Sequence, residues 1–148
     1  MLERTLPAGT GRGQAHVHTD FAQTFEILEG DGMVSVDGEE RPVAAGDRVE
    51  VARGVAHVDA WNERGGPMSF RMTIAPRPYF VEVYAANWAR WLEEGRLNDQ
   101  DELKPLQLFA ILHATRAESY AAGPPIWVQR PFLAVAGRLG RLRHRPVL

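Results

Sequence analysis

The first half of the chain alternates short hydrophobic segments with glycine-containing turns. Each segment mixes β-branched, aromatic and polar residues, which is typical of strands with one buried face. No long helical pattern interrupts the segments, and their close spacing favours an all-β sandwich or barrel over βαβ units. The predicted strands are residues 24–28, 33–36, 48–51, 56–61 and 68–74.

The pattern changes after Pro76 and Pro78, where apolar residues begin to recur every three or four positions. This spacing places them on one face of a helix. The predicted helices are residues 79–97, 106–120 and 127–143. We therefore expect a β-barrel over residues 1–78 and a helical extension over residues 79–148, packed on the barrel or at a dimer interface.

The chain of 148 residues has the composition of an ordinary globular protein, with 45% hydrophobic and 24% charged residues. It contains no cysteine, which excludes disulfide scaffolds, zinc ribbons, iron–sulfur clusters and thiol nucleophiles. Metal or acid–base chemistry near neutral pH must therefore depend on carboxylates and on the five histidines.

Charge is divided unevenly along the chain. Residues 1–102 hold 10 basic and 18 acidic residues, whereas residues 103–148 hold 7 basic residues and 1 acidic residue. The basic, leucine-containing run 137–145 could bind nucleic acid or an anionic membrane, end a solvated helix, or pair with the acidic barrel. Because the charge boundary falls inside the helical extension, we favour self-contact and expect neither a nucleic-acid nor a membrane partner. No targeting signal is visible, so we expect a cytoplasmic protein.

Three histidines have the spacing of a metal site. His16 and His18 lie on a predicted strand, where residues i and i+2 point to the same face. Gln23 follows five residues later, and His57 lies on a later strand. Two imidazoles on one face of a strand point into one cavity, as a metal site requires.

The spacing of these residues resembles the two sequence motifs of the cupin superfamily. The residues that match or replace motif positions are Gly11, His16, His18, Gln23 and Gly30, then Gly46, Ala52, Gly54, His57 and Asn62. This chain departs from the motifs in several ways: one residue fewer before His16, Gln23 for glutamate, Ala52 for proline, and one extra residue before Asn62. The resemblance implies a double-stranded β-helix, the cupin or jelly-roll barrel, here followed by about three C-terminal helices. The helical part resembles extensions on uncharacterised bacterial cupins and implies no activity.

The resemblance implies a divalent transition metal held by His16, His18 and His57. Gln23 is either a fourth ligand or a hydrogen-bonding residue of the cavity. The candidate ions are Zn, Ni, Fe, Cu and Mn, and the nitrogen content of the set favours Ni, Zn, Cu or Fe over the harder Mn. An amide in place of a carboxylate removes one negative charge, which favours anionic substrates.

Several other side chains are expected to line the barrel interior and to be available to a substrate. Asp59 shares the side-chain direction of His57 unless the extra residue forms a bulge, and it could support the site or act as a base. The remaining pair of histidines, His113 and His144, is expected at the surface of the helical extension. The predicted lining residues are Phe25, Ile27, Asp59, Trp61, Phe70 and Met72.

Three functional classes stay open at this point. The first is a metal-dependent enzyme of the oxygenase, isomerase, lyase or decarboxylase class acting on a small anionic or carbonyl substrate. The alternative is a non-catalytic barrel that binds or senses a small molecule, with the helices as lid or dimerisation element. The third is an interaction protein whose helical extension is the working part. Family resemblance also implies a homodimer.

Overall fold

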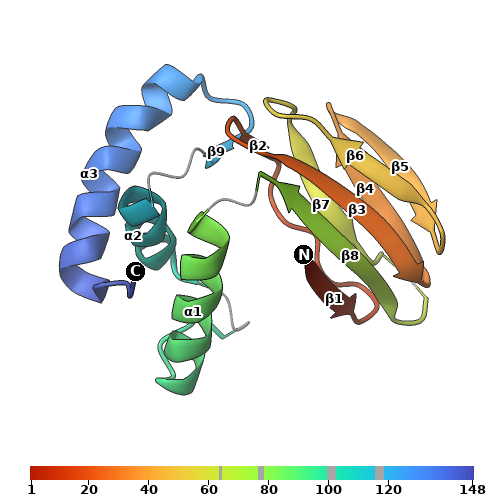
Figure 1. Cartoon of the computed structure of the whole chain (residues 1–148), viewed down its shortest axis with the longest axis horizontal. Coiled ribbons are helices and arrows are strands. Elements are labelled where there is room, and N and C mark those ends of the chain that lie inside the picture. Colours follow the sequence, from red (N-terminus) through yellow and green to blue (C-terminus); the bar gives the residue numbers. More distant parts are fainter. Residues whose placement is uncertain (64, 77–78, 100–102, 116–118) are drawn as a thin grey trace. The chain divides into compact units, whose positions relative to one another are not determined.

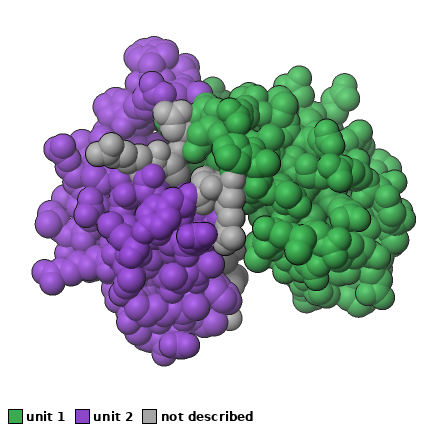
Figure 2. Space-filling model, in the orientation of Figure 1, with its two compact units in different colours: residues 1–76, 119–123 green, residues 77–118, 124–148 purple. Residues whose placement is uncertain are grey.

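The computed structural model describes residues 1–63, 65–76, 79–99, 103–115 and 119–148. The chain divides into two compact units (Figures 1 and 2). The first unit contains residues 1–76 and 119–123, and the second contains residues 77–118 and 124–148. A short segment from the predicted helical extension therefore belongs to the β unit.

The first unit consists of two antiparallel sheets, as the sequence predicts. One sheet has the order β1 (Leu2–Leu6), β8 (Met68–Ala75), β3 (Ala22–Glu29), β6 (Arg48–Val51). The other has the order β5 (Glu39–Ala44), β4 (Asp31–Val36), β7 (His57–Trp61), β2 (His16–His18), β9 (Ser119–Ala121). In this sheet β2 and β7 are neighbours.

The two sheets share one hydrophobic core. Along β3, buried and half-buried residues alternate, so Gln23, Phe25 and Ile27 point inward together. Because side chains alternate along the strand, Gln23 points into the barrel on the same face as Phe25 and Ile27, at the end of the apolar row. The buried core residues are Leu6, Phe25, Ile27, Val34, Val43, Val49, Val51, Ala60, Met68 and Phe70.

The second unit contains three helices: α1 (Tyr79–Glu93), α2 (Pro105–Thr115) and α3 (Ile126–His144). α2 and α3 approach closely because Gly137 and Gly140 face α2, where an added Cβ would overlap His113 and the backbone oxygen of Leu106. No helix in the described part of the chain is long and apolar enough to cross a membrane.

Two predicted helices end earlier than their periodicity indicates. The first ends at Glu93, because Gly95 adopts a positive φ of 63° and the amide of Arg96 bonds back to the Trp91 carbonyl. The second ends at Thr115, and Ser119–Ala121 forms strand β9 instead. Tyr120 is buried opposite Val17 of β2, so pairing with a distant strand overrides the local helical pattern.

Gly32 in β4 gives a direct test of how tightly β7 is held. A side chain at this position would overlap the Trp61 backbone oxygen of β7 and the Met68 sulfur. We expect Gly32→Ala to lower the free energy of unfolding by about 1–3 kcal/mol, because the β7 backbone must shift. Gly66→Ala is the matched control, since nothing lies within 4 Å of its added Cβ. Equal urea midpoints for the two variants would contradict this packing.

Candidate metal centre

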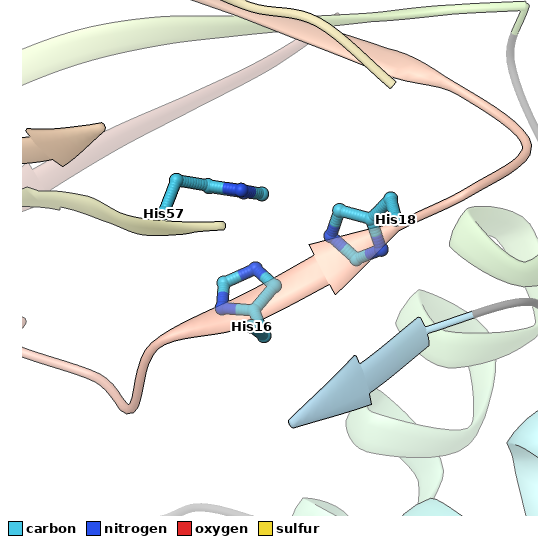
Figure 3. A group of neighbouring side chains, drawn as sticks. All are labelled: His16, His18 and His57. Atoms are coloured by element: carbon cyan, nitrogen blue, oxygen red, sulfur yellow. The ribbon is translucent and has the colours of Figure 1, made fainter. Parts of the chain in front are cut away.

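Strands β2 and β7 bring the three histidines together. His16 is the direct antiparallel partner of His57, and His18 lies two residues further along β2 on the same face. One ligand nitrogen from each residue lies within 4.8 Å of the others. Figure 3 shows the three rings directed toward one another from these two strands.

Backbone carbonyls fix the orientation of two of the rings. Nδ1 of His16 lies 2.9 Å from the Gln14 oxygen, and Nδ1 of His57 lies 3.0 Å from the Val55 oxygen. A carbonyl only accepts hydrogen bonds, so Nδ1 of His16 is the donor and a neutral His16 ring carries its lone pair on Nε2. His57 faces an acceptor at each ring nitrogen, the Val55 oxygen at Nδ1 and Gln23 Oε1 at Nε2, and a neutral ring can donate to only one of them. Metal-binding histidines are typically oriented in this way.

His18 is buried and incompletely satisfied. Its ring stacks on Phe21 at a centroid distance of 4.1 Å, and only 7% of the residue is exposed. Its Nδ1 has no hydrogen-bond partner among the described residues. Burial, and to a smaller extent the charges that His16 and His57 carry when protonated, lower the pKa of His18 to about 3. His18 is therefore neutral at pH 7.

His57 is also held neutral by its surroundings. Burial lowers the pKa of His57, and this exceeds the opposing effects of its hydrogen bond to Val55 and of the Asp59 charge. A neutral imidazole is the form that binds a metal. The site therefore presents two buried histidines in the protonation state that coordination requires.

Gln23 reaches this group from the facing sheet. Its Oε1 lies 2.5 Å from Nε2 of His57, and its Nε2 donates to the Met72 sulfur at 3.2 Å. Gln23 is only 5% exposed. Gln23, the fourth residue of the predicted set, therefore contacts His57.

Asp59 lies on the same face of β7 as His57. The extra residue expected in this segment appears as a shift of register between β4 and β7. Ser35 pairs with Val58 and Met33 with Trp61, so β7 has one residue more than β4 between these two pairs. Asp59 nevertheless keeps the direction of His57. Its Oδ1 lies 3.6 Å from Nε2 of His57 and 3.7 Å from Nε2 of His16.

Comparison with known proteins gives the family. The family model described as "Cupin domain" matches residues 2–74, which contain every residue of the histidine group. This chain belongs to the cupin superfamily. Its two antiparallel sheets and following helices agree with the double-stranded β-helix that the sequence motifs imply.

Solved structures also resemble the barrel of this cupin. The TT1209 protein of Thermus thermophilus is 30% identical, with 51% of this chain and 70% of that chain covered and a TM-score of 0.47. A predicted oxalate decarboxylase of Thermotoga maritima is 26% identical, with 49% and 61% covered and a TM-score of 0.46. A cupin protein of Bacteroides fragilis is 30% identical, with 49% and 59% covered and a TM-score of 0.42.

These similarities are partial. The present chain spans less than two thirds of the Thermotoga and Bacteroides proteins. No curated protein matches the chain. The comparisons therefore give the family and the fold, and the chemistry has to be argued from the site.

The residues of this cupin fit a divalent transition metal. Nε2 of His16, Nε2 of His57, the Gln23 amide oxygen and a buried Nδ1 of His18 without a partner among the described residues converge in a small space. Buried polar atoms without partners are unfavourable unless another group satisfies them. Three imidazoles with oxygen donors suit Zn, Ni, Cu or Fe.

The other predicted lining residues occupy different environments. Phe25, Ile27 and Phe70 fill the hydrophobic core, and Met72 packs against it. Trp61 is buried, and the guanidinium of Arg12 lies 4.6 Å from its ring centroid. Contact of these residues with a substrate stays a prediction.

The two remaining histidines, His113 and His144, lie on helices of the second unit. They are not part of the cluster of His16, His18 and His57 found among the described residues.

The sequence did not predict strand β9, which pairs with strand β2. Ser119 of β9 pairs with His18, and Ala121 pairs with His16. Short strands such as β9 leave little periodic signal in a sequence.

Protonation of His18 should make the metal-free protein less stable in acid. Its pKa falls from the ordinary value of 6.5 to about 3 on folding, so the unfolded chain binds more protons between these limits. The free energy of unfolding is therefore not reduced by His18 above pH 6.5. It decreases as the pH falls below this value, by on the order of 2 kcal/mol at pH 5. Urea unfolding of chelator-treated protein between pH 5 and 7 measures this slope. His18→Asn should flatten the slope, and an unchanged slope would contradict the assignment.

Proposed function

We propose that this cupin binds one divalent transition metal through His16, His18 and His57 and acts as a metal-dependent enzyme on a small anionic or carbonyl compound. The strongest support is the convergence of three imidazoles, of which His18 and His57 are kept neutral by burial. Gln23 contacts His57 and would add an amide oxygen to the site.

The neutral donors leave the site suited to anions. When bound, a divalent ion would act as a Lewis acid that polarises a carbonyl or carboxylate oxygen of the substrate. Three imidazoles and an amide contribute no charge, so the site would attract negative groups. His16 is 26% exposed in its side chain, whereas His18 and His57 are buried. A substrate would therefore enter on the His16 side, with the buried histidines behind it.

The reaction class follows the family expectation: oxygenase, isomerase, lyase or decarboxylase. Asp59 is the carboxylate beside the histidines, and its side chain is 30% exposed. Asp59 therefore reaches both the histidines and solvent.

Metal content tests this function directly. The protein, purified without a histidine tag and reconstituted separately with Ni, Zn and, under anaerobic conditions, Fe, should hold about one equivalent per chain by mass spectrometry. His57→Ala should abolish stoichiometric binding, because it removes a buried ligand. His113→Ala is the control and should retain full content. Wild-type protein that stays far below one equivalent with all three metals would contradict the proposal.

A second candidate is a non-catalytic barrel that binds a small molecule. The observation that favours it is the 2.5 Å contact between His57 and Gln23, since side chains that bond each other need no metal. This candidate predicts little metal and saturable binding of a small ligand. The metal measurement therefore separates the two candidates.

We propose that a second copy of the chain covers an apolar stripe on α3. The stripe recurs at intervals of four and three residues, which is typical of helices that pair with helices. Most of it lies on the side of α3 away from Gly137 and Gly140, which face α2. Phe132 lies nearest to α2, where its ring contacts Phe109 at a centroid distance of 5.8 Å. The stripe residues, 45–77% exposed, are Val128, Phe132, Val135, Leu139 and Leu142.

The oligomeric state tests this contact. Size-exclusion chromatography with light scattering should find a dimer for the wild-type protein. Leu139→Glu should give a monomer, because it places a charge in the stripe. Ala134→Glu adds the same charge to an exposed position beside the stripe and should remain dimeric. A monomeric wild-type protein would contradict the proposal.

A further inference from the structure

We propose that the carboxylate of Asp59 is the anionic ligand of the metal centre, the charge that Gln23 cannot supply. This inference rests on the proposed metal function. It assigns to the site a residue that stands outside the three-histidine group.

The position of Asp59 on β7 directs its carboxylate at two of the histidines. It follows His57 by two residues and shares its face, so Oδ1 lies 3.6 Å from Nε2 of His57 and 3.7 Å from Nε2 of His16. This oxygen is buried and has no hydrogen-bond donor among the described residues. A buried carboxylate oxygen without a donor calls for a cation.

Neither neighbouring histidine donates a hydrogen bond to this oxygen of Asp59. The ring proton of His16 sits on Nδ1, where it bonds to the Gln14 carbonyl, so a neutral His16 presents its Nε2 lone pair toward Asp59. His57 faces acceptors at both ring nitrogens, the Val55 oxygen and Gln23 Oε1, and when neutral it can donate to only one of them. Electron-pair donors are therefore left facing one another, which is the arrangement that a metal ion satisfies.

The distances also fit ligation by one ion. Two ligand atoms bound at about 2.1 Å to the same ion lie roughly 3.0–3.5 Å apart in octahedral or tetrahedral geometry. The 3.6 and 3.7 Å separations from Asp59 require only a small inward movement. Gln23 Oε1, at 2.5 Å from His57 Nε2, lies too close for both atoms to bind one ion without moving apart.

A carboxylate changes the charge of the site in a defined way. Three neutral imidazoles and Gln23 leave a divalent ion with its full charge, whereas Asp59 reduces the net charge to +1. Partial neutralisation strengthens retention of the ion, and the remaining positive charge still favours an anionic substrate. The competing explanation is an ion pair between Asp59 and a protonated His16 that involves no metal.

Metal affinity of matched variants tests the inference. The affinity for Zn²⁺ and Co²⁺ is measured at pH 7 by competition with a chromophoric chelator, and the visible spectrum of bound Co²⁺ reports the ligand set. Asp59→Asn should weaken binding roughly tenfold or more and change the Co²⁺ spectrum. Asp31→Asn makes the same change at an exposed residue of β4 and should leave affinity unchanged. Adding Gln23→Glu to Asp59→Asn should restore affinity, because it returns a carboxylate to the site.

Each result supports or overturns the inference. Wild-type affinity in Asp59→Asn would overturn it while leaving the three-histidine metal site intact. An equal loss in Asp31→Asn would also overturn it, because the loss would then reflect net charge rather than ligation. Wild-type protein that binds neither metal would overturn the proposed function and this inference together. Circular dichroism confirms that each variant is folded.

Discussion

The site depends on one constraint: three imidazoles, two of them buried, must stay close together in a small space. Burial disfavours protonation of His18 and His57, and backbone carbonyls orient the rings of His16 and His57 through Nδ1. Nitrogen lone pairs brought close together do not stabilise one another. A metal ion that accepts them would remove this unfavourable contact.

The surrounding strands keep the imidazoles in place. Antiparallel pairing puts His16 opposite His57, and β9 pairs with the other edge of the short strand β2. The facing sheet adds Gln23, which lies at the end of the inward row formed by Phe25 and Ile27. The polar residues of the site therefore begin where the apolar core of the barrel ends.

The sequence predicts the parts of this arrangement that follow from local periodicity. Residues two apart on a strand share a face, so the joint direction of His16 and His18 could be derived from spacing. The turn at Asp37 and Gly38 is likewise indicated by residue type, since an Asp-Gly pair favours the positive φ that both residues adopt. The strand that follows it, β5, is not among the predicted strands, because its mostly exposed residues lack the alternating pattern. Strand β9 could not be predicted, because its pairing with β2 joins residues far apart in the chain. The approach of Asp59 to two histidines depends on where the extra residue of β7 is accommodated, which spacing alone leaves open.

The central claim is that the three histidines hold a metal ion. A crystal structure of the reconstituted protein, with anomalous scattering recorded at the absorption edge of the metal, tests this claim most directly. One strong anomalous peak per chain is expected within bonding distance of Nε2 of His16, Nε2 of His57 and a ring nitrogen of His18. A fully reconstituted crystal with no peak among these three rings would contradict it.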